Sequence, residues 1–111
     1  MLIFFLDQDL AQLCQENRIA QRKLGAEGAK KLRRRLDDLD AAPSLDVMRT
    51  LPGRCHELKG DRAGELALDL AGGSRLLFRP EHDPIPAKPD GGLDWAQVTS
   101  ITITWVGDYH D

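Results

Sequence analysis

The chain has 111 residues, 41% of them hydrophobic and 30% charged, which predicts one globular domain over residues 1–111 and excludes a largely disordered protein. No apolar run approaches the roughly 20 residues of a membrane span, and the apolar run at residues 2–6 lacks the positive start and cleavage site of a signal peptide, so we expect a cytoplasmic protein without a membrane partner. The net charge of −3 argues against nucleic-acid binding by overall charge, yet residues 18–35 hold eight basic side chains against one acid.

The two cysteines, Cys14 and Cys55, are too few for a disulfide framework and lack the Cys-x-x-Cys spacing of zinc sites. Cys14 falls on the apolar face of a predicted helix, where a buried free thiol is expected. We therefore predict neither a metal site nor a cofactor.

The first forty residues predict a strand followed by two helices. Residues 1–6 are rich in aromatic and branched apolar side chains and predict a buried strand. Asp7 is the expected cap of a helix that runs to Gly25, where glycine ends or bends it. Residues 26–40 continue the apolar spacing of a second helix. Two helices joined at a glycine predict an antiparallel helical hairpin.

The second half of the chain predicts sheet. A short helical turn is expected after the capping residue Ser44, at residues 45–50. Strands are then expected at residues 54–58, 65–70, 75–79 and 97–106. Residues 80–93 hold four of the six prolines and predict a surface loop.

Period-two alternation assigns side chains of these strands to the two faces of the sheet. Leu66, Leu68 and Leu70 are expected on the buried face of their strand. Leu76 and Phe78 share one face of the next strand, and Arg75, Leu77 and Arg79 share the other. In the last strand Ile101, Ile103 and Trp105 are expected on one side, and Thr102, Thr104 and Val106 on the opposite side.

The fold class predicted from this order is α+β. The N-terminal strand and the two-helix hairpin pack on a mostly antiparallel sheet of four to five strands. The hairpin covers one face of this sheet, and the other face stays open with Arg75 and Arg79.

Seven side chains of the second half could together cleave RNA without a metal. Such cleavage needs a base for the 2′-hydroxyl, an acid for the leaving 5′-oxygen and cations for the charge of the phosphorane. Two histidines, a phenol, a carboxylate and three cations supply these groups. The candidates are His56, Lys59, Arg62, Arg75, Asp108, Tyr109 and His110.

Each candidate also has a structural alternative. A single histidine in a strand is most often a structural residue, and residues 108–110 could be a frayed end. Arg75 and Arg79 could belong to a solvated sheet face, as could the basic side chains of the second helix. These alternatives stay open on spacing alone.

Residues 54–70, RCHELKGDRAGELALDL, resemble the central block of the HigB branch of the RelE/ParE toxin superfamily. The shared pattern is a histidine, then Leu-Lys-Gly, a basic Arg-x-Gly turn and a strand that leads to an arginine-bearing strand. Residues 74–78 resemble this last strand. Residues 106–110 resemble the closing Asp-Tyr-His of the family, and residues 23–32 resemble its helix-hairpin joint. The likeness covers nearly the whole chain.

This resemblance implies a RelE-like toxin of a type II toxin-antitoxin system that cleaves mRNA in the ribosome and inhibits translation. It implies inhibition by a HigA-like helix-turn-helix antitoxin. By position it makes His56, Lys59, Asp108, Tyr109 and His110 the catalytic set. The remaining basic residues would bind mRNA or ribosomal RNA, namely Arg62, Arg75, Arg79, Lys30, Lys31 and Arg34. The acid and base roles of the two histidines stay unassigned, because coupled groups do not reveal microscopic roles.

The alternative is a RelE-like fold without nuclease activity. Such a protein would act as a ParE-like gyrase poison or as an antitoxin-binding corepressor. The acidic net charge favours this alternative, and the pair His56 and His110 favours the nuclease.

Overall fold

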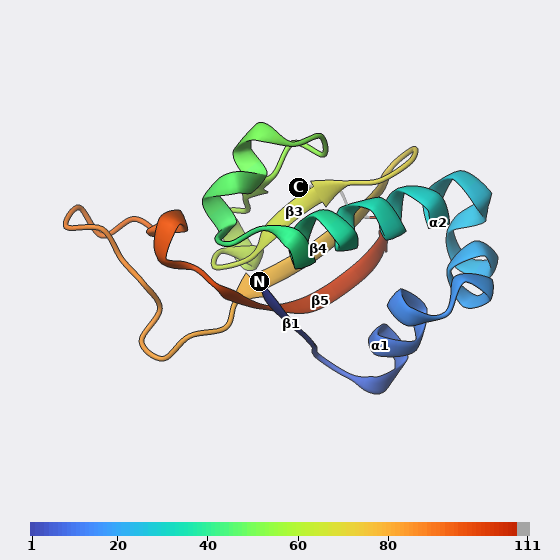
Figure 1. The fold of residues 1–111 in the computed structure, drawn as a ribbon, viewed down its shortest axis with the longest axis horizontal. Coiled ribbons are helices and arrows are strands. Elements are labelled where there is room, and N and C mark those ends of the chain that lie inside the picture. The colour runs from blue at the N-terminus through green and yellow to red at the C-terminus, as the bar shows by residue number, and fades with distance from the viewer. Residues whose placement is uncertain (109–111) are drawn as a thin grey trace.

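The computed structural model describes residues 1–108 (Figure 1). The strands are β1 (Leu2–Phe5), β2 (His56–Glu57), β3 (Leu66–Asp69), β4 (Ser74–Pro80) and β5 (Ser100–Asp108). The α-helices are α1 (Gln8–Gln15) and α2 (Asn17–Ala41). Three short 3-10 helices lie in the connections: η1 (Leu45–Thr50), η2 (Gly60–Arg62) and η3 (Trp95–Gln97). In the part of the chain described, no helix is long and apolar enough to cross a membrane.

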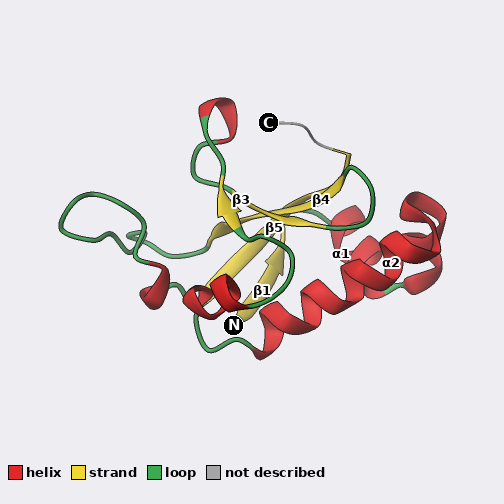
Figure 2. Ribbon diagram, turned by 90° about the horizontal axis from the view of Figure 1, so that it is seen from above, coloured by secondary structure: helices red, strands yellow, loops and turns green. Residues whose placement is uncertain are grey.

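The five strands form one sheet in the order β1, β5, β4, β3, β2. β1 pairs parallel to β5, and all other neighbours pair antiparallel. The long helix α2 crosses one face of the sheet, and the two views agree that α1 and α2 lie on this same side (Figures 1 and 2). The predicted α+β class, with an N-terminal strand and a helical hairpin on a mostly antiparallel sheet, is confirmed.

The apolar core lies between α2 and the covered face of the sheet. Leu32, Leu36 and Leu39 recur at the spacing of one helix face, and all three are buried in this core. The sheet contributes alternate residues of its central strands, among them Leu66, Leu68, Leu76, Phe78, Ile101 and Ile103. The alternation predicted for β3 and β4 is therefore confirmed.

The helical region is interrupted twice rather than once. Gly25 has φ 78° and ψ 173°, so the predicted bend at this glycine is confirmed. The uninterrupted helix predicted between Asp7 and Gly25 is wrong, because the chain leaves helical geometry at Glu16 (φ −114°, ψ 107°). This break frees the carbonyl of Cys14, which accepts a hydrogen bond from Arg33 Nη1 at 3.3 Å. The cap at Asp7 is present, with Oδ1 accepting from the Leu10 N–H at 2.9 Å.

β1 is an edge strand, and the prediction of a buried strand is half wrong. Ile3 and Phe5 pack against the core, whereas the side chains of Leu2, Phe4 and Leu6 are 64%, 49% and 52% exposed. The physical reason is the position of β1, which lies at the end of the strand order with helices on only one of its faces. Apolar composition predicted the strand but did not distinguish an edge strand from a central one.

β5 contains an irregularity that overturns its predicted alternation. Trp105 pairs with Leu77 and Ile103 pairs with Phe78, so Thr104 is an extra residue at the register shift. Beyond the bulge the faces exchange. Val106 joins Ile103 in the core, and Trp105 moves to the open face with 38% exposure.

The segment between α2 and β3 differs from the prediction in two details. β2 spans only His56–Glu57, because Arg54 adopts a left-handed φ of 53° and interrupts the strand expected at residues 54–58. Residues 45–50 form η1, but the side chain of Ser44 makes no capping hydrogen bond, so its predicted capping role is wrong.

Candidate functional site on the open face of the sheet

The candidate site lies on the face of the sheet opposite α2. Cross-strand pairing aligns four residues in one row across this face: His56 on β2, Ala67 on β3, Leu77 on β4 and Trp105 on β5. Residues directly opposite in neighbouring strands project to the same face. The next row along the sheet carries Asp69, Arg75 and Gly107. The topology thus brings His56 and Arg75 to the same face.

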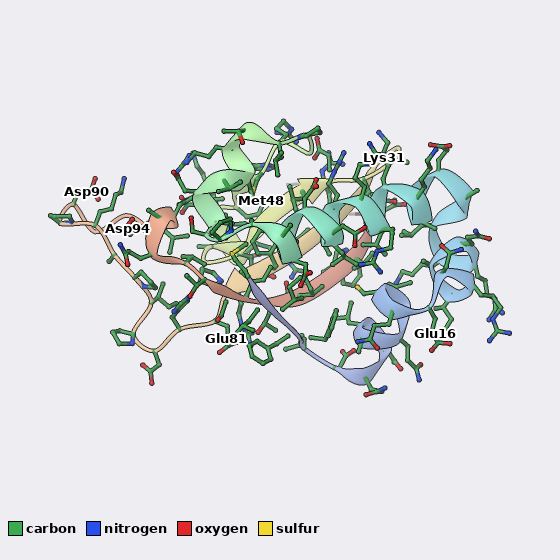
Figure 3. All side chains as sticks on the ribbon, viewed as in Figure 1. Glu16, Lys31, Met48, Glu81, Asp90 and Asp94 are labelled. Atoms are coloured by element: carbon green, nitrogen blue, oxygen red, sulfur yellow. The ribbon has the colours of Figure 1, made fainter. Side chains whose placement is uncertain are left out.

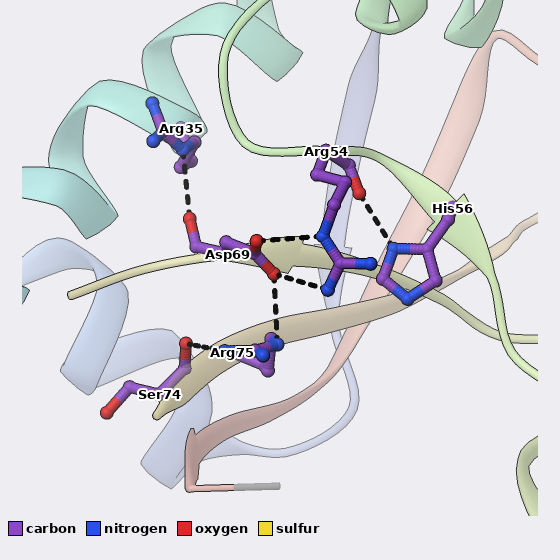
Figure 4. A network of polar contacts seen from close by, with 6 residues as sticks. All are labelled: Arg35, Arg54, His56, Asp69, Ser74 and Arg75. Carbon is purple, nitrogen blue, oxygen red and sulfur yellow. Dashed lines mark hydrogen bonds and ion pairs between the residues drawn. The ribbon is translucent and has the colours of Figure 1, made fainter. Parts of the chain in front are cut away.

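Asp69 is the centre of a charge cluster on this face (Figure 4). Its carboxylate accepts from Arg54 Nε at 3.1 Å and from Arg54 Nη2 at 3.3 Å. Arg75 Nε lies 2.9 Å from the same carboxylate. The backbone carbonyl of Asp69 accepts from the buried Arg35 Nε at 3.0 Å. One aspartate therefore holds two arginines of the open face, and α2 fixes its backbone from the other side.

His56 is oriented by a backbone contact. Its Nδ1 lies 2.7 Å from the carbonyl oxygen of Arg54. Because a carbonyl oxygen only accepts, Nδ1 carries the proton, and in neutral His56 the ring nitrogen able to take up a proton is Nε2. This geometry depends on the left-handed conformation of Arg54, which is unusual for a residue with a side chain.

β5 ends beside this cluster. Asp108 pairs with Ser74, and its Oδ1 accepts from Ser74 Oγ at 3.1 Å. Gly107 pairs with Arg75, so the last described residues of β5 lie next to an arginine of the cluster. The predicted catalytic residues Tyr109 and His110 lie outside the described residues. The catalytic pairing of His56 with His110, which requires the two side chains to lie close together, therefore stays a prediction.

The turn that carries Lys59 and Arg62 folds over the open face. Arg62 Nη1 lies 3.1 Å from Glu65, and the carboxylate of Glu65 also accepts from the Thr104 hydroxyl at the β5 bulge. Beneath this turn Leu58, Ala67 and Leu77 form a small second apolar cluster. Arg62 is thus attached to the sheet, while the exposed Lys59 starts the turn.

The other predicted RNA-binding residues lie away from His56. Lys30, Lys31 and Arg34 are exposed on α2, the helix of the covered face, and Figure 3 marks Lys31 there. Arg79 is on the open face near β1, 3.8 Å from Glu81 in an ion pair. The structure therefore groups His56 with Arg75 and places the α2 cations in a different layer.

The loop of residues 81–99 connects β4 to β5 at the end of the sheet away from Ser74 and Asp108. His82 Nε2 accepts the N–H groups of Thr99 and Ser100 at 3.0 and 3.3 Å. The buried Trp95 donates its Nε1–H to Glu57 at 3.0 Å and lies under the guanidinium of Arg49. These contacts anchor the segment to the start of β5 through His82 and to β2 through Trp95, a role that its composition did not reveal.

Neither cysteine is an activated nucleophile. Burial raises the pKa of Cys14 to about 12, and the positive charge of Arg33 opposes this only in part. Burial also raises the pKa of Cys55 to about 12, against a lowering by Arg49. Cys55 therefore stays a neutral thiol beside His56. Among residues 1–108, no three His, Cys, Asp or Glu side chains cluster in a way that could hold a metal ion.

Three residues of the site were missing from the sequence prediction. The sequence indicated Asp69 only weakly, as a single acidic residue among the leucines of β3, at a position that alternation assigns to the open face. Arg54 gave none, because its left-handed conformation brings it to Asp69. Trp105 was assigned to the wrong face because period-two alternation cannot show a bulge.

Comparison with solved structures identifies the fold. The chain is similar to the YoeB/ParE toxin from Agrobacterium tumefaciens, with a TM-score of 0.59 and 14% sequence identity over 99% of this chain and 100% of that one. No family model matches the sequence, and no curated protein matches it. This chain therefore shares the fold of that toxin, and the resemblance is confirmed at the level of the fold.

Proposed function

We propose that this protein is the toxin of a type II toxin-antitoxin system and acts as a ribosome-dependent mRNA endonuclease of the HigB type in the cytoplasm. The observation that carries the proposal is the gathering of His56, Arg54 and Arg75 on the uncovered face of the sheet, beside the end of β5. β5 leads directly into Tyr109 and His110. We propose that His110 lies in this corner, which would then hold the groups needed for acid-base cleavage of a phosphodiester.

The chemistry follows from the proposed roles. The 2′-oxygen loses its proton to one of the two histidines and attacks the neighbouring phosphorus. The 5′-oxygen leaves with a proton donated by the other histidine. Nε2 of His56 can serve as the acceptor, because Nδ1 is committed to the Arg54 carbonyl. Lys59 and Arg75 would stabilise the negative charge of the phosphorane, Arg62 would bind a neighbouring phosphate, and Asp108 and Tyr109 would orient His110.

The partners follow from the distribution of charge. The exposed Lys30, Lys31 and Arg34 on α2 suit ribosomal RNA, whose phosphates attract a basic helix, and Arg79 extends the basic residues of the open face. Such a toxin requires an inhibitor, which we propose to be a HigA-like helix-turn-helix antitoxin.

The test is induction of the gene in bacteria, with growth and mRNA 5′ ends followed over time. We expect growth arrest and new 5′ ends within translated mRNA, and we expect the variants His56→Ala and His110→Ala to lose both. Cys14→Ala is the matched control, because it removes a side chain remote from the proposed site. Equal toxicity of the His110→Ala variant would contradict the proposed cluster.

A second candidate is a non-nucleolytic toxin of the ParE type. The observation in its favour is that Asp69 forms ion pairs with both Arg54 and Arg75 and so lowers the positive charge of this face, within a chain of net charge −3. A gyrase poison would induce DNA damage and leave mRNA uncut. The same 5′-end mapping therefore separates the two candidates.

A further inference from the structure

Trp105 is the unusual side chain of the open face. The bulge at Thr104 turns it away from the core, where the alternation of β5 would otherwise put it. Its indole packs over Gly107, since a Cβ added to this glycine would lie 3.5 Å from the ring atoms Cζ2 and Nε1. The side chain nevertheless stays 38% exposed. A large aromatic ring is thus held on a rigid strand and presented to solvent.

Two cations lie over this ring in cation–π contacts. Lys23 Nζ lies 5.6 Å and Arg62 Cζ lies 5.9 Å from a ring centroid of Trp105. They come from distant parts of the chain, α2 and η2, and converge on one indole. An exposed aromatic ring between two cations suits a ligand with a flat π-surface and negative charges, which is the chemistry of a nucleotide.

A groove continues from the ring between α1 and β5. It has a volume of about 370 Å³, and its lining includes Leu10, Ile19, Lys23 and Trp105. Asp7 and Asp9 also line it, and their carboxylates would repel a phosphate. The groove therefore favours the neutral base of a nucleotide, with the phosphates kept on the side of the two cations.

The strand register connects this ring to the proposed catalytic site. Trp105 is directly opposite Leu77, which makes Arg75 its diagonal neighbour across β4 and β5. Such neighbours lie about 7–8 Å apart. His56 lies in the same row as Trp105, three strands away, which corresponds to roughly 14 Å at the usual spacing between strands. A short stretch of extended RNA can reach both positions.

We infer that Trp105 is a stacking platform for one base of the bound single-stranded RNA, flanked by Lys23 and Arg62 as phosphate contacts. This inference rests on the proposed function and adds a base-binding site to it. Stacking accepts any base because every base has a π-face, so the platform holds the strand in position without reading the sequence.

Intrinsic fluorescence tests the inference, because the chain has two tryptophans and Trp95 is buried. The variant Trp95→Phe leaves Trp105 as the single tryptophan, which excitation at long wavelength selects over the one tyrosine. We expect saturable quenching by a 2′-O-methyl RNA oligomer, which cannot be cleaved, and little quenching by an abasic oligomer of the same length. If Trp95→Phe does not fold, the wild-type protein is compared with Trp105→Leu, and the quenching should disappear in the latter.

Binding by anisotropy gives the second measurement. We expect Trp105→Leu to bind the oligomer about tenfold more weakly, with its salt dependence unchanged. Lys23→Ala should instead reduce the slope of the salt dependence by about one. Phe4→Leu is the matched control, because Phe4 is 49% exposed on the same face and no cation lies over its ring among the contacts described. It should bind like the wild-type protein.

The outcomes separate this inference from the proposed function. Equal affinity of Trp105→Leu and wild type, with mRNA still cut in cells, would overturn the platform and leave the nuclease in place. Equal quenching by the abasic oligomer would also overturn it, since it would show contact with the backbone alone. Base-dependent quenching without new mRNA 5′ ends would support the platform and refute the nuclease.

Discussion

The two faces of the sheet are held together by different interactions. On the covered face, Phe78, Leu68 and Ile103 are completely buried against α2, and their contacts are apolar and without direction. On the open face, Asp69 joins Arg54 and Arg75 through directed, partly exposed ion pairs. Burial of apolar surface dominates folding, whereas exposed ion pairs contribute little.

This difference suggests where the chain can change without unfolding. The exposed polar side chains of the open face can be replaced at small cost in stability, so their identities are available for chemistry. Those of the covered face cannot, because close-packed interiors do not absorb lost volume. The predictions below test this division, beginning with the largest effect.

Phe78→Ala and Arg79→Ala compare neighbouring residues that point to opposite faces. Phe78 is 0% exposed, and we expect its replacement to lower the free energy of unfolding by about 3–5 kcal/mol, through lost burial and the resulting cavity. The Arg79 side chain is 46% exposed, and its replacement should change the free energy by less than about 0.5 kcal/mol. Urea denaturation measures both. Similar losses in the two variants would refute the division.

The covered face was also the more predictable of the two. The spacing of Leu32, Leu36 and Leu39 and the alternation of Leu66 and Leu68 follow from helix and strand geometry, and each was found as expected. Periodicity works there because burial acts on every residue of a regular element.

The open face depended on three local deviations from regular geometry. The left-handed Arg54, the extra Thr104 and the edge position of β1 together decide where Arg54, Trp105 and Phe4 point. Each deviation is set by packing between distant segments rather than by neighbours in sequence. The motifs at residues 54–70 and 74–78 indicated His56 and Arg75, but they could not indicate Asp69 as the residue that joins the two arginines.

Asp69→Asn tests whether charge organises the open face. The change keeps the shape of the side chain, but it removes the negative charge between Arg54 and Arg75. We expect a loss of about 1 kcal/mol in the free energy of unfolding, and partial recovery as added salt screens the two arginines. Asp90→Asn is the control, because Asp90 forms an exposed pair with Lys88 at 3.8 Å. Identical salt dependence of the two variants would show that Asp69 has no organising role.

The two thiols provide the last and smallest test of the division between the faces. Cys14 and Cys55 both contact the covered core. His56, the neighbour of Cys55, projects to the open face. Burial raises both pKa values from 9.0 to about 12, so the folded protein holds about a thousandfold less thiolate than the unfolded chain near neutral pH. We expect iodoacetamide to alkylate the unfolded chain in urea much faster than the folded protein at pH 8.

The same shift predicts how stability depends on pH. The folded state holds the thiol protons more tightly, so this contribution to stability is complete below pH 9 and is lost as the pH rises toward 12. Comparing the wild-type protein with a Cys14→Ala/Cys55→Ala variant isolates this effect, since all other titrating groups are shared. The two stability curves should run parallel below pH 9 and converge or cross above it. Fast alkylation of folded Cys55 at pH 8 would instead place its thiol on the solvent side with His56, and would refute the division between the faces at this residue.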